Sequence, residues 1–163
     1  MPIEIERKFL VDGDAWRTGV RRRELYRQGY VASSESCSVR VRVAGSTAWI
    51  GLKGRVQGAS RLEYEYEIPM HEALEILDML CERGRIEKWR HWVPHAGHEW
   101  EVDEFLGDNA GLVVAEIELD DEAESFARPS WLGAEVTHDV RYFNSCLADH
   151  PSREWSEAAR AAG

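Results

Sequence analysis

Hydrophobic and polar residues alternate with a period of two along most of the first 119 residues. In residues 37–44, for example, valine occupies positions 39, 41 and 43 and alternates with Ser38, Arg40 and Arg42. Successive side chains of a β-strand point to opposite faces, so this pattern predicts strands with one apolar and one polar face. The alternation predicts eight strands, at about residues 3–11, 25–31, 37–44, 47–54, 61–68, 85–93, 99–105 and 113–119.

The period changes to that of an amphipathic α-helix after Pro69. Apolar residues then recur at helical spacing, which predicts a helix over residues 70–83 with Gly84 as its C-terminal cap. The C-terminal third is expected to form a short helix over residues 120–127 and an irregular elbow over 129–133. A last helix is expected to start at Thr137 and to carry an apolar stripe through Leu147.

Composition places the chain among single-domain globular proteins. It has 163 residues, of which 44% are hydrophobic and 31% charged, and a net charge of −10. We expect one domain over residues 1–150 and a frayed tail over 151–163. The acidic charge disfavours nucleic-acid binding, and the absence of an apolar run of about 20 residues or of a signal peptide predicts a cytoplasmic protein without a membrane partner. Three cysteines without metal-type spacing, Cys37, Cys81 and Cys146, are expected to be buried thiols.

Seven of the eight predicted strands carry ionisable residues at every second position of one face. For one strand alone, a face exposed to solvent is the simplest interpretation. Like charges at i and i+2 repel each other, however, and a surface strand has no reason to collect them. The acidic doublets are Glu4/Glu6, Glu63/Glu65, Glu101/Asp103 and Glu116/Glu118, and the basic set is Arg40/Arg42 and Lys88/Arg90 with Lys8 and Lys53.

An antiparallel sheet of eight strands can close into a barrel, which places one set of alternating residues inside. If the charged set faces inward, the lumen is a water-filled channel with a cationic wall and an anionic wall. The apolar set then faces outward and is covered by the predicted helices. Because like charges repel, removal of one lumen charge, as in Lys53→Ala or Glu116→Gln, is expected to lower activity and to leave stability level or raise it.

Such a lumen suits a complex of a metal with a polyphosphate. Clustered carboxylates without an organised Cys or His set select hard divalent cations, Mg²⁺ or Mn²⁺. Arginine and lysine side chains grip the oxygens of small, highly charged anions. Together they predict a site where cations neutralise the phosphates and the metal activates an attacking water.

The opening stretch Glu4-Ile5-Glu6-Arg7-Lys8 resembles the ExExK signature of the CYTH family, also called triphosphate tunnel metalloenzymes. ExExK alone is a weak pattern, but the ordered series of doublets that follows is specific, and the resemblance extends to about Leu147. It continues through Val39-Arg40-Val41-Arg42, Leu52-Lys53, Glu63-Tyr64-Glu65, Glu87-Lys88-Trp89-Arg90, Val102-Asp103, Glu116-Ile117-Glu118, Trp131-Leu132-Gly133-Ala134-Glu135-Val136-Thr137 and Arg141-Tyr142.

The resemblance implies an α+β, strand-dominated fold: a closed eight-stranded antiparallel barrel or tunnel with covering helices and a C-terminal plug helix. It also implies a triphosphate substrate and an Mg²⁺ or Mn²⁺ requirement. Phosphate would be bound by Lys8, Arg40, Arg42, Lys53, Lys88 and Arg90, and metal by Glu4, Glu6, Glu63, Glu116 and Glu118. The catalytic set would be Lys53, Glu65, Lys88 and Asp103, with the two acids as further metal ligands or orienters of the attacking water.

Within the family, the sequence is most similar to the bacterial inorganic triphosphatases. Class IV adenylate cyclases carry a His-Phe pair ahead of ExExK, and here only Met1-Pro2-Ile3 precede Glu4, so cyclase activity is disfavoured. Thiamine triphosphatase stays open as the alternative, since Trp49 and Trp92 share the lumen face and could stack on an organic cation. Packing at the lumen end is the preferred interpretation of both. A non-catalytic polyphosphate-binding module also stays open, as does the choice between monomer and homodimer.

Overall fold

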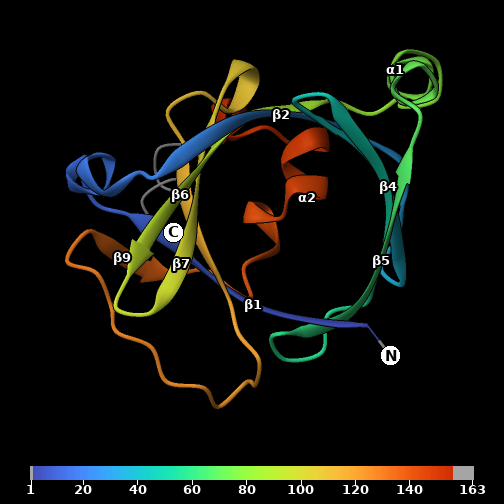
Figure 1. The fold of residues 1–163 in the computed structure, drawn as a ribbon. Coiled ribbons are helices and arrows are strands. Elements are labelled where there is room, and N and C mark those ends of the chain that lie inside the picture. Colours follow the sequence, from blue (N-terminus) through green and yellow to red (C-terminus); the bar gives the residue numbers. More distant parts are fainter. Residues whose placement is uncertain (1, 156–163) are drawn as a thin grey trace.

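The computed structural model describes residues 2–155 and shows a β-barrel, viewed along its axis in Figure 1. Eight antiparallel strands form the barrel wall and a short ninth strand lies outside it, which confirms the predicted fold class. The strands are β1 Ile3–Val11, β2 Arg22–Ser33, β3 Cys37–Ala44, β4 Thr47–Gly54, β5 Ser60–Ile68, β6 Ile86–His95, β7 His98–Phe105, β8 Val113–Glu118 and β9 Leu132–Glu135.

Strand β1 closes the barrel because it pairs with two strands that are distant in sequence. Its first part, from Ile3 to Ile5, pairs with β5, and its later part, from Glu6 to Leu10, pairs with β8. The remaining strands follow in the order β5-β4-β3-β2-β6-β7-β8. The ExExK stretch therefore lies at the seam of the barrel, between the hairpin of β4 and β5 and the hairpin of β7 and β8.

Helix α1, Met70–Met79, packs outside the barrel against β3 and β4 through Ala73 and Leu77. It is shorter than predicted, and the prediction that Gly84 caps it is wrong. Gly84 instead lies against the C-terminal helix: a Cβ atom on Gly84 would come 2.0 Å from the carbonyl oxygen of Ala148. The glycine is needed for this close approach of two backbones.

The segment after β8 also differs from the prediction, because residues 120–131 form bends, turns and irregular backbone rather than a helix. Phe126 and Trp131 of this segment pack on the outward residues of β1 and β7, including Phe9 and Trp100. Burial of aromatic side chains orders the segment without a helical period. Part of the predicted elbow is strand β9, which pairs with β1.

The predicted last helix is broken into two pieces. A 3₁₀ turn, η3 Val140–Tyr142, is followed by helix α2, Asn144–Asp149, which lies across the barrel opening in Figure 1. Thr137 does not cap a helix; its Oγ1 accepts a hydrogen bond from the Lys8 amide at 3.0 Å. Three further 3₁₀ turns complete the fold: η1 Ala15–Gly19, η2 Gly107–Asn109 and η4 Ser152–Glu154.

The predicted frayed tail lies partly outside the described residues. Its first part packs on the barrel: Ser152 is buried and its amide donates to Asn109 Oδ1 at 2.8 Å, and Trp155 stacks edge-on against Tyr142. Tertiary contacts therefore extend the ordered body beyond residue 150.

The apolar face of the strands points outward, as predicted, and most of it is covered. Phe9, Trp100 and Ile117 are fully buried beneath η1 and residues 120–131. Tyr64 and Tyr66 of β5 are exposed, so the covering is incomplete there. The prediction of three buried thiols is confirmed only for Cys81, since Cys37 is exposed and Cys146 is half-buried. In the described part of the chain, every helix is too short or too polar to cross a membrane.

Candidate active site

The barrel encloses a charged cavity of about 170 Å³. Every site residue that the sequence predicted lines this cavity except Asp103. The cross-strand register explains the convergence, since Glu6 lies opposite Glu118 and Lys8 opposite Glu116 on the inner face of the barrel. The inward orientation of the charged face is therefore confirmed.

The predicted division into a cationic and an anionic wall is wrong, because charges of opposite sign pair with each other across the cavity lining. Lys53 Nζ lies 3.0 Å from Glu4 Oε2 and 3.5 Å from Glu63 Oε2. Lys8 Nζ lies 3.4 Å from Glu116 Oε1. Strands of opposite charge are neighbours in the closed sheet, so each of these cations finds a carboxylate on the next strand.

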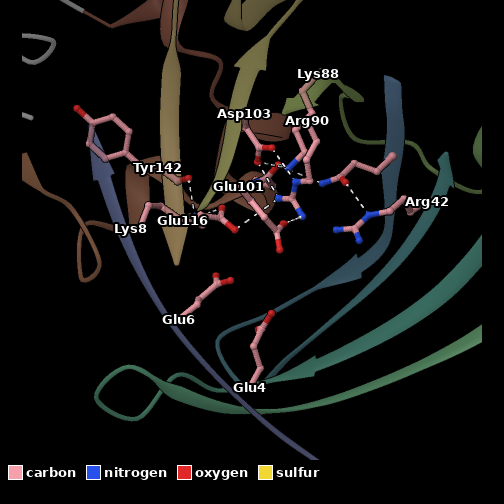
Figure 2. A network of polar contacts seen from close by, with 12 residues as sticks. Glu4, Glu6, Lys8, Arg42, Lys88, Arg90, Glu101, Asp103, Glu116 and Tyr142 are labelled. Atoms are coloured by element: carbon pink, nitrogen blue, oxygen red, sulfur yellow. Dashed lines mark hydrogen bonds and ion pairs between the residues drawn. The ribbon is translucent and has the colours of Figure 1, made fainter. Parts of the chain in front are cut away.

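Asp103 lies behind the cavity wall and joins two cations. It is fully buried, its Oδ2 accepts from Lys88 Nζ at 2.6 Å, and its two oxygens accept from Arg90 Nε and Nη2 at 2.8 Å each (Figure 2). Burial favours the protonated acid, but Arg90 and Lys88 outweigh it and hold the pKa of Asp103 below its usual value. With both oxygens occupied, Asp103 is placed to position cations rather than to bind metal or water.

Two of the cations, Lys88 and Arg42, are buried beyond what their partners compensate, whereas Asp103 and Glu101 raise the pKa of Arg90 despite its burial. Burial lowers the pKa of Lys88 to about 7, against the opposing effect of Asp103. Burial, with Arg40 and Arg90 nearby, lowers the pKa of Arg42 to about 10. Both shifts mean that the charged forms of these two side chains lack sufficient negative partners, so an anion that enters the cavity would interact favourably with them.

Two carboxylates of the cavity, Glu6 and Glu118, have raised pKa values, so their charged forms are disfavoured. Burial, followed by repulsion from Glu116 and Glu4, raises the pKa of Glu6 to about 7. Burial and repulsion from Glu4 and Glu101 also raise the pKa of Glu118. Figure 2 shows Glu4 and Glu6 pointing into the cavity below Glu116 and Glu101. Repelling carboxylates that face one space suit a hard divalent cation, so this donor set fits the metal that the family implies.

The candidate metal ligands are not preassembled, however. Among the residues that the structure describes, no three His, Cys, Asp or Glu side chains lie close enough to hold an ion. The ion pairs give the reason, since Glu4 is held by Lys53 and Arg61, and Glu116 by Lys8. A cation would therefore have to replace some of these pairs.

Sequence reasoning missed several residues of the cavity lining. Arg61 shares the inward face of β5 with Glu63, so its position in the alternation could have identified it. Phe143 and Asn144 come from the start of α2 and also line the cavity. No strand period marks those two positions, so the sequence pattern alone could not place them there.

The packing interpretation of the two lumen-face tryptophans is confirmed. Trp92 is buried against Tyr26 and Ala44, with Trp49 packed beside them, and the guanidinium of Arg22 lies 3.5 Å from the centroid of the Trp92 ring. Neither tryptophan lines the charged cavity. They fill the barrel beside Arg42 and Arg90, both of which lie over the Tyr26 ring.

Comparisons with known proteins agree with this geometry. An inorganic triphosphatase of Acetivibrio thermocellus is 53% identical over 154 residues, which cover 94% of this chain and 98% of that protein. An inorganic triphosphatase of Nitrosomonas europaea is 38% identical, with 89% of this chain and 96% of that protein covered. A crystal structure of an inorganic triphosphatase superposes with a TM-score of 0.63 at 34% identity, covering 89% of this chain and 97% of that one. The CYTH domain model matches residues 2–145, and the chain therefore belongs to the CYTH domain family.

Proposed function

We propose that this protein hydrolyses inorganic tripolyphosphate to pyrophosphate and phosphate in its charged cavity, with Mg²⁺ or Mn²⁺ as cofactor. The observation that carries the proposal is the lining itself, in which buried lysines and arginines face the same space as a crowded set of carboxylates. The names of the two relatives above support the choice of an inorganic substrate. The tryptophans that could have held an organic group are taken up in packing.

The substrate would be bound by the cationic residues of the lining. Arg40 and Arg42 on β3 and Arg90 on β6 offer guanidinium groups that can grip phosphate oxygens in pairs. Lys8, Lys53 and Lys88 add single charges from three other positions of the wall. Lys8 and Lys53 would each exchange an internal carboxylate for a phosphate oxygen, so little charge is left uncompensated when the substrate enters.

The metal would be held by Glu4, Glu63 and Glu116, which this exchange releases, together with Glu6 and Glu118. When bound, a divalent cation would offset the charge of the phosphates and polarise a phosphoryl oxygen. Water attack on a terminal phosphorus forms one P–O bond and breaks the bridging P–O bond, which releases phosphate and pyrophosphate. Glu65, which lines the cavity, would orient the water, and Lys53 and Lys88 would stabilise the charge that develops on the oxygens.

A substrate panel tests the proposal. The purified protein is incubated with tripolyphosphate, thiamine triphosphate or ATP, each with Mg²⁺ or Mn²⁺, and released phosphate and cyclic AMP are measured. We expect tripolyphosphate to be hydrolysed fastest, and no cyclic AMP. Faster hydrolysis of thiamine triphosphate would reassign the substrate. Binding of tripolyphosphate by calorimetry without turnover by either metal would favour a non-catalytic binding module.

A further inference from the structure

Asn144, the first residue of helix α2, contacts the buried cation Lys88 through its side chain. Its Oδ1 accepts hydrogen bonds from Lys88 Nζ at 3.0 Å and from Gln28 Nε2 at 3.1 Å. Gln28 is almost fully buried, and its own Oε1 accepts from Arg42 Nε at 3.3 Å. A chain of hydrogen bonds therefore runs from Arg42 through Gln28 and Asn144 to Lys88.

The chemistry of these groups determines the orientation of both amides. Lysine and arginine only donate hydrogen bonds, so each must meet an amide oxygen. Gln28 offers its oxygen to Arg42 and its nitrogen to Asn144, which leaves the oxygen of Asn144 facing both Gln28 and Lys88. Neither amide can rotate by half a turn without losing a hydrogen bond to a buried cation.

Lys88 has three N–H donors, and two of them have hydrogen-bond partners among the residues that the structure describes. Asp103 Oδ2 accepts one at 2.6 Å and Asn144 Oδ1 accepts another at 3.0 Å. Fixing two donors also fixes the direction of the third. Because Lys88 lines the cavity, the third N–H is available to a ligand there.

An amide suits this position better than a carboxylate would. It accepts from Lys88 without adding negative charge beside the phosphate site, whereas a second acid next to Asp103 would repel a polyphosphate. The buried Lys88 thus keeps its orientation while part of its charge remains for an anionic ligand.

We infer that Asn144 is a positioning residue that orients Lys88 toward the substrate. Through this contact, helix α2 takes part in the phosphate site. This inference rests on the proposed function, because it takes Lys88 as a group that binds the triphosphate. Gln28 extends the same chain of hydrogen bonds to Arg42.

A double-mutant cycle, in which the affinity for tripolyphosphate is measured, tests the positioning role of Asn144. Affinity for tripolyphosphate is measured by calorimetry without divalent cation in the wild type, Asn144→Leu, Lys88→Met and the double variant. We expect Asn144→Leu to weaken binding about tenfold in the wild-type background and less than about twofold in the Lys88→Met background, since the residue acts through Lys88.

The matched control is Asp149→Ala on the same helix. Asp149 ends α2 and pairs with Arg83 at 2.8 Å, outside the chain of hydrogen bonds that reaches Lys88. Its effect on binding should be equal in both backgrounds. Asn144→Ala replaces Asn144→Leu in the cycle if the leucine variant fails to fold.

Equal losses for Asn144→Leu in the two backgrounds would overturn the positioning role and leave the proposed function standing. Wild-type protein that binds tripolyphosphate but never hydrolyses it would overturn the hydrolase proposal, and the binding cycle would still decide the role of Asn144. A wild type that does not bind tripolyphosphate at all would overturn both.

Discussion

The partners of each charged side chain in the cavity decide what its removal does. Lys53 lies between Glu4 and Glu63, whereas Glu6 is surrounded mainly by other carboxylates. Opposite charges stabilise the charged form of Lys53, whereas like charges destabilise the charged form of Glu6. Variants at these positions should therefore affect stability in opposite directions.

Lys53→Ala should lower tripolyphosphate hydrolysis by roughly 10²-fold or more, because it removes a cation that stabilises charge on the phosphates. It should also lower stability somewhat, since Glu4 and Glu63 lose a shared partner. The expectation of level or higher stability overlooked these pairs. Phosphate release and urea unfolding measure the two effects, with Arg55→Ala in the exposed loop after β4 as control. Unchanged hydrolysis would remove Lys53 from the site.

Glu6→Gln and Glu116→Gln should shift stability in opposite directions. Glu116 is ionised and paired with Lys8 and Arg90, so its neutralisation should lower the free energy of unfolding by about 2–4 kcal/mol. Neutralising Glu6 relieves repulsion and should raise it by about 1–2 kcal/mol. Urea unfolding near neutral pH in a chelating buffer gives both values. Shifts of the same sign would contradict this account of the cavity charges.

At the scale of elements, the closing helix depends on backbone contacts as much as on its own sequence. Helix α2 is only six residues long, too short to be stable alone, and Leu147 anchors it in the cluster with Tyr30 and Ile86. Gly84, which follows α1, lies directly against its last turn. Two segments far apart in sequence thus determine how the end of the barrel is filled.

Gly84→Ala should destabilise the protein by about 1–3 kcal/mol or more, because the new methyl group would overlap the Ala148 carbonyl unless α2 moves. Hydrolysis should fall as well, since α2 carries Asn144 into the cavity. Thermal unfolding and phosphate release measure the two losses. Glu82→Ala, at an exposed neighbouring position, is the matched control. A Gly84→Ala variant as stable as the wild type would show that α2 adjusts freely.

At the scale of the whole molecule, the closed barrel brings carboxylates from separate strands into one space and stores repulsion among them. Glu6 and Glu118 come from paired strands, and Glu101 comes from β7. Such repulsion should appear as a dependence of stability on pH and on cations. Both dependences belong to the closed barrel, because the unfolded chain separates these groups.

Glu6 should make the metal-free protein less stable as the pH rises from about 4.5 to about 7. Its pKa is about 7 in the folded state and 4.5 in the unfolded state, so the folded state binds more protons in this range. The free energy of unfolding then decreases as the pH rises through 7. Lys88, whose pKa is lowered to about 7, acts in the opposite sense above that pH. The free energy of unfolding is measured with urea at several pH values for the wild type and Glu6→Gln, and the difference between the two proteins isolates the contribution of Glu6. A difference that does not change with pH would contradict the prediction.

A divalent cation should stabilise the folded protein, because it binds carboxylates that the unfolded chain does not hold together. We expect the unfolding temperature to rise with Mg²⁺ or Mn²⁺ and to return to its initial value with chelator. Glu6→Gln combined with Glu118→Gln should reduce the rise. No rise for either metal, in the presence or absence of tripolyphosphate, would count against a metal site in the cavity.

The sequence by itself determined the barrel, its eight main strands and the inward set of charged residues. Residues such as Arg40 and Arg42 on β3, or Glu116 and Glu118 on β8, repeat with the period of a strand, and this period is local. When nearly every strand carries like charges on one face, these charges are stable only if charges of the opposite sign on other strands lie close to them. The alternation of residues is therefore enough to indicate a closed, charged lumen.

Only the tertiary structure decided which charges meet and what closes the barrel. The pairing of Lys53 with Glu4 depends on the seam between β1 and β5, which no sequence period encodes. Asn144 reaches Lys88 because α2 folds back into the barrel end, although the sequence predicted one longer helix there. Contacts between residues distant in the chain are set by packing and register, so they override the local preferences that a sequence pattern expresses.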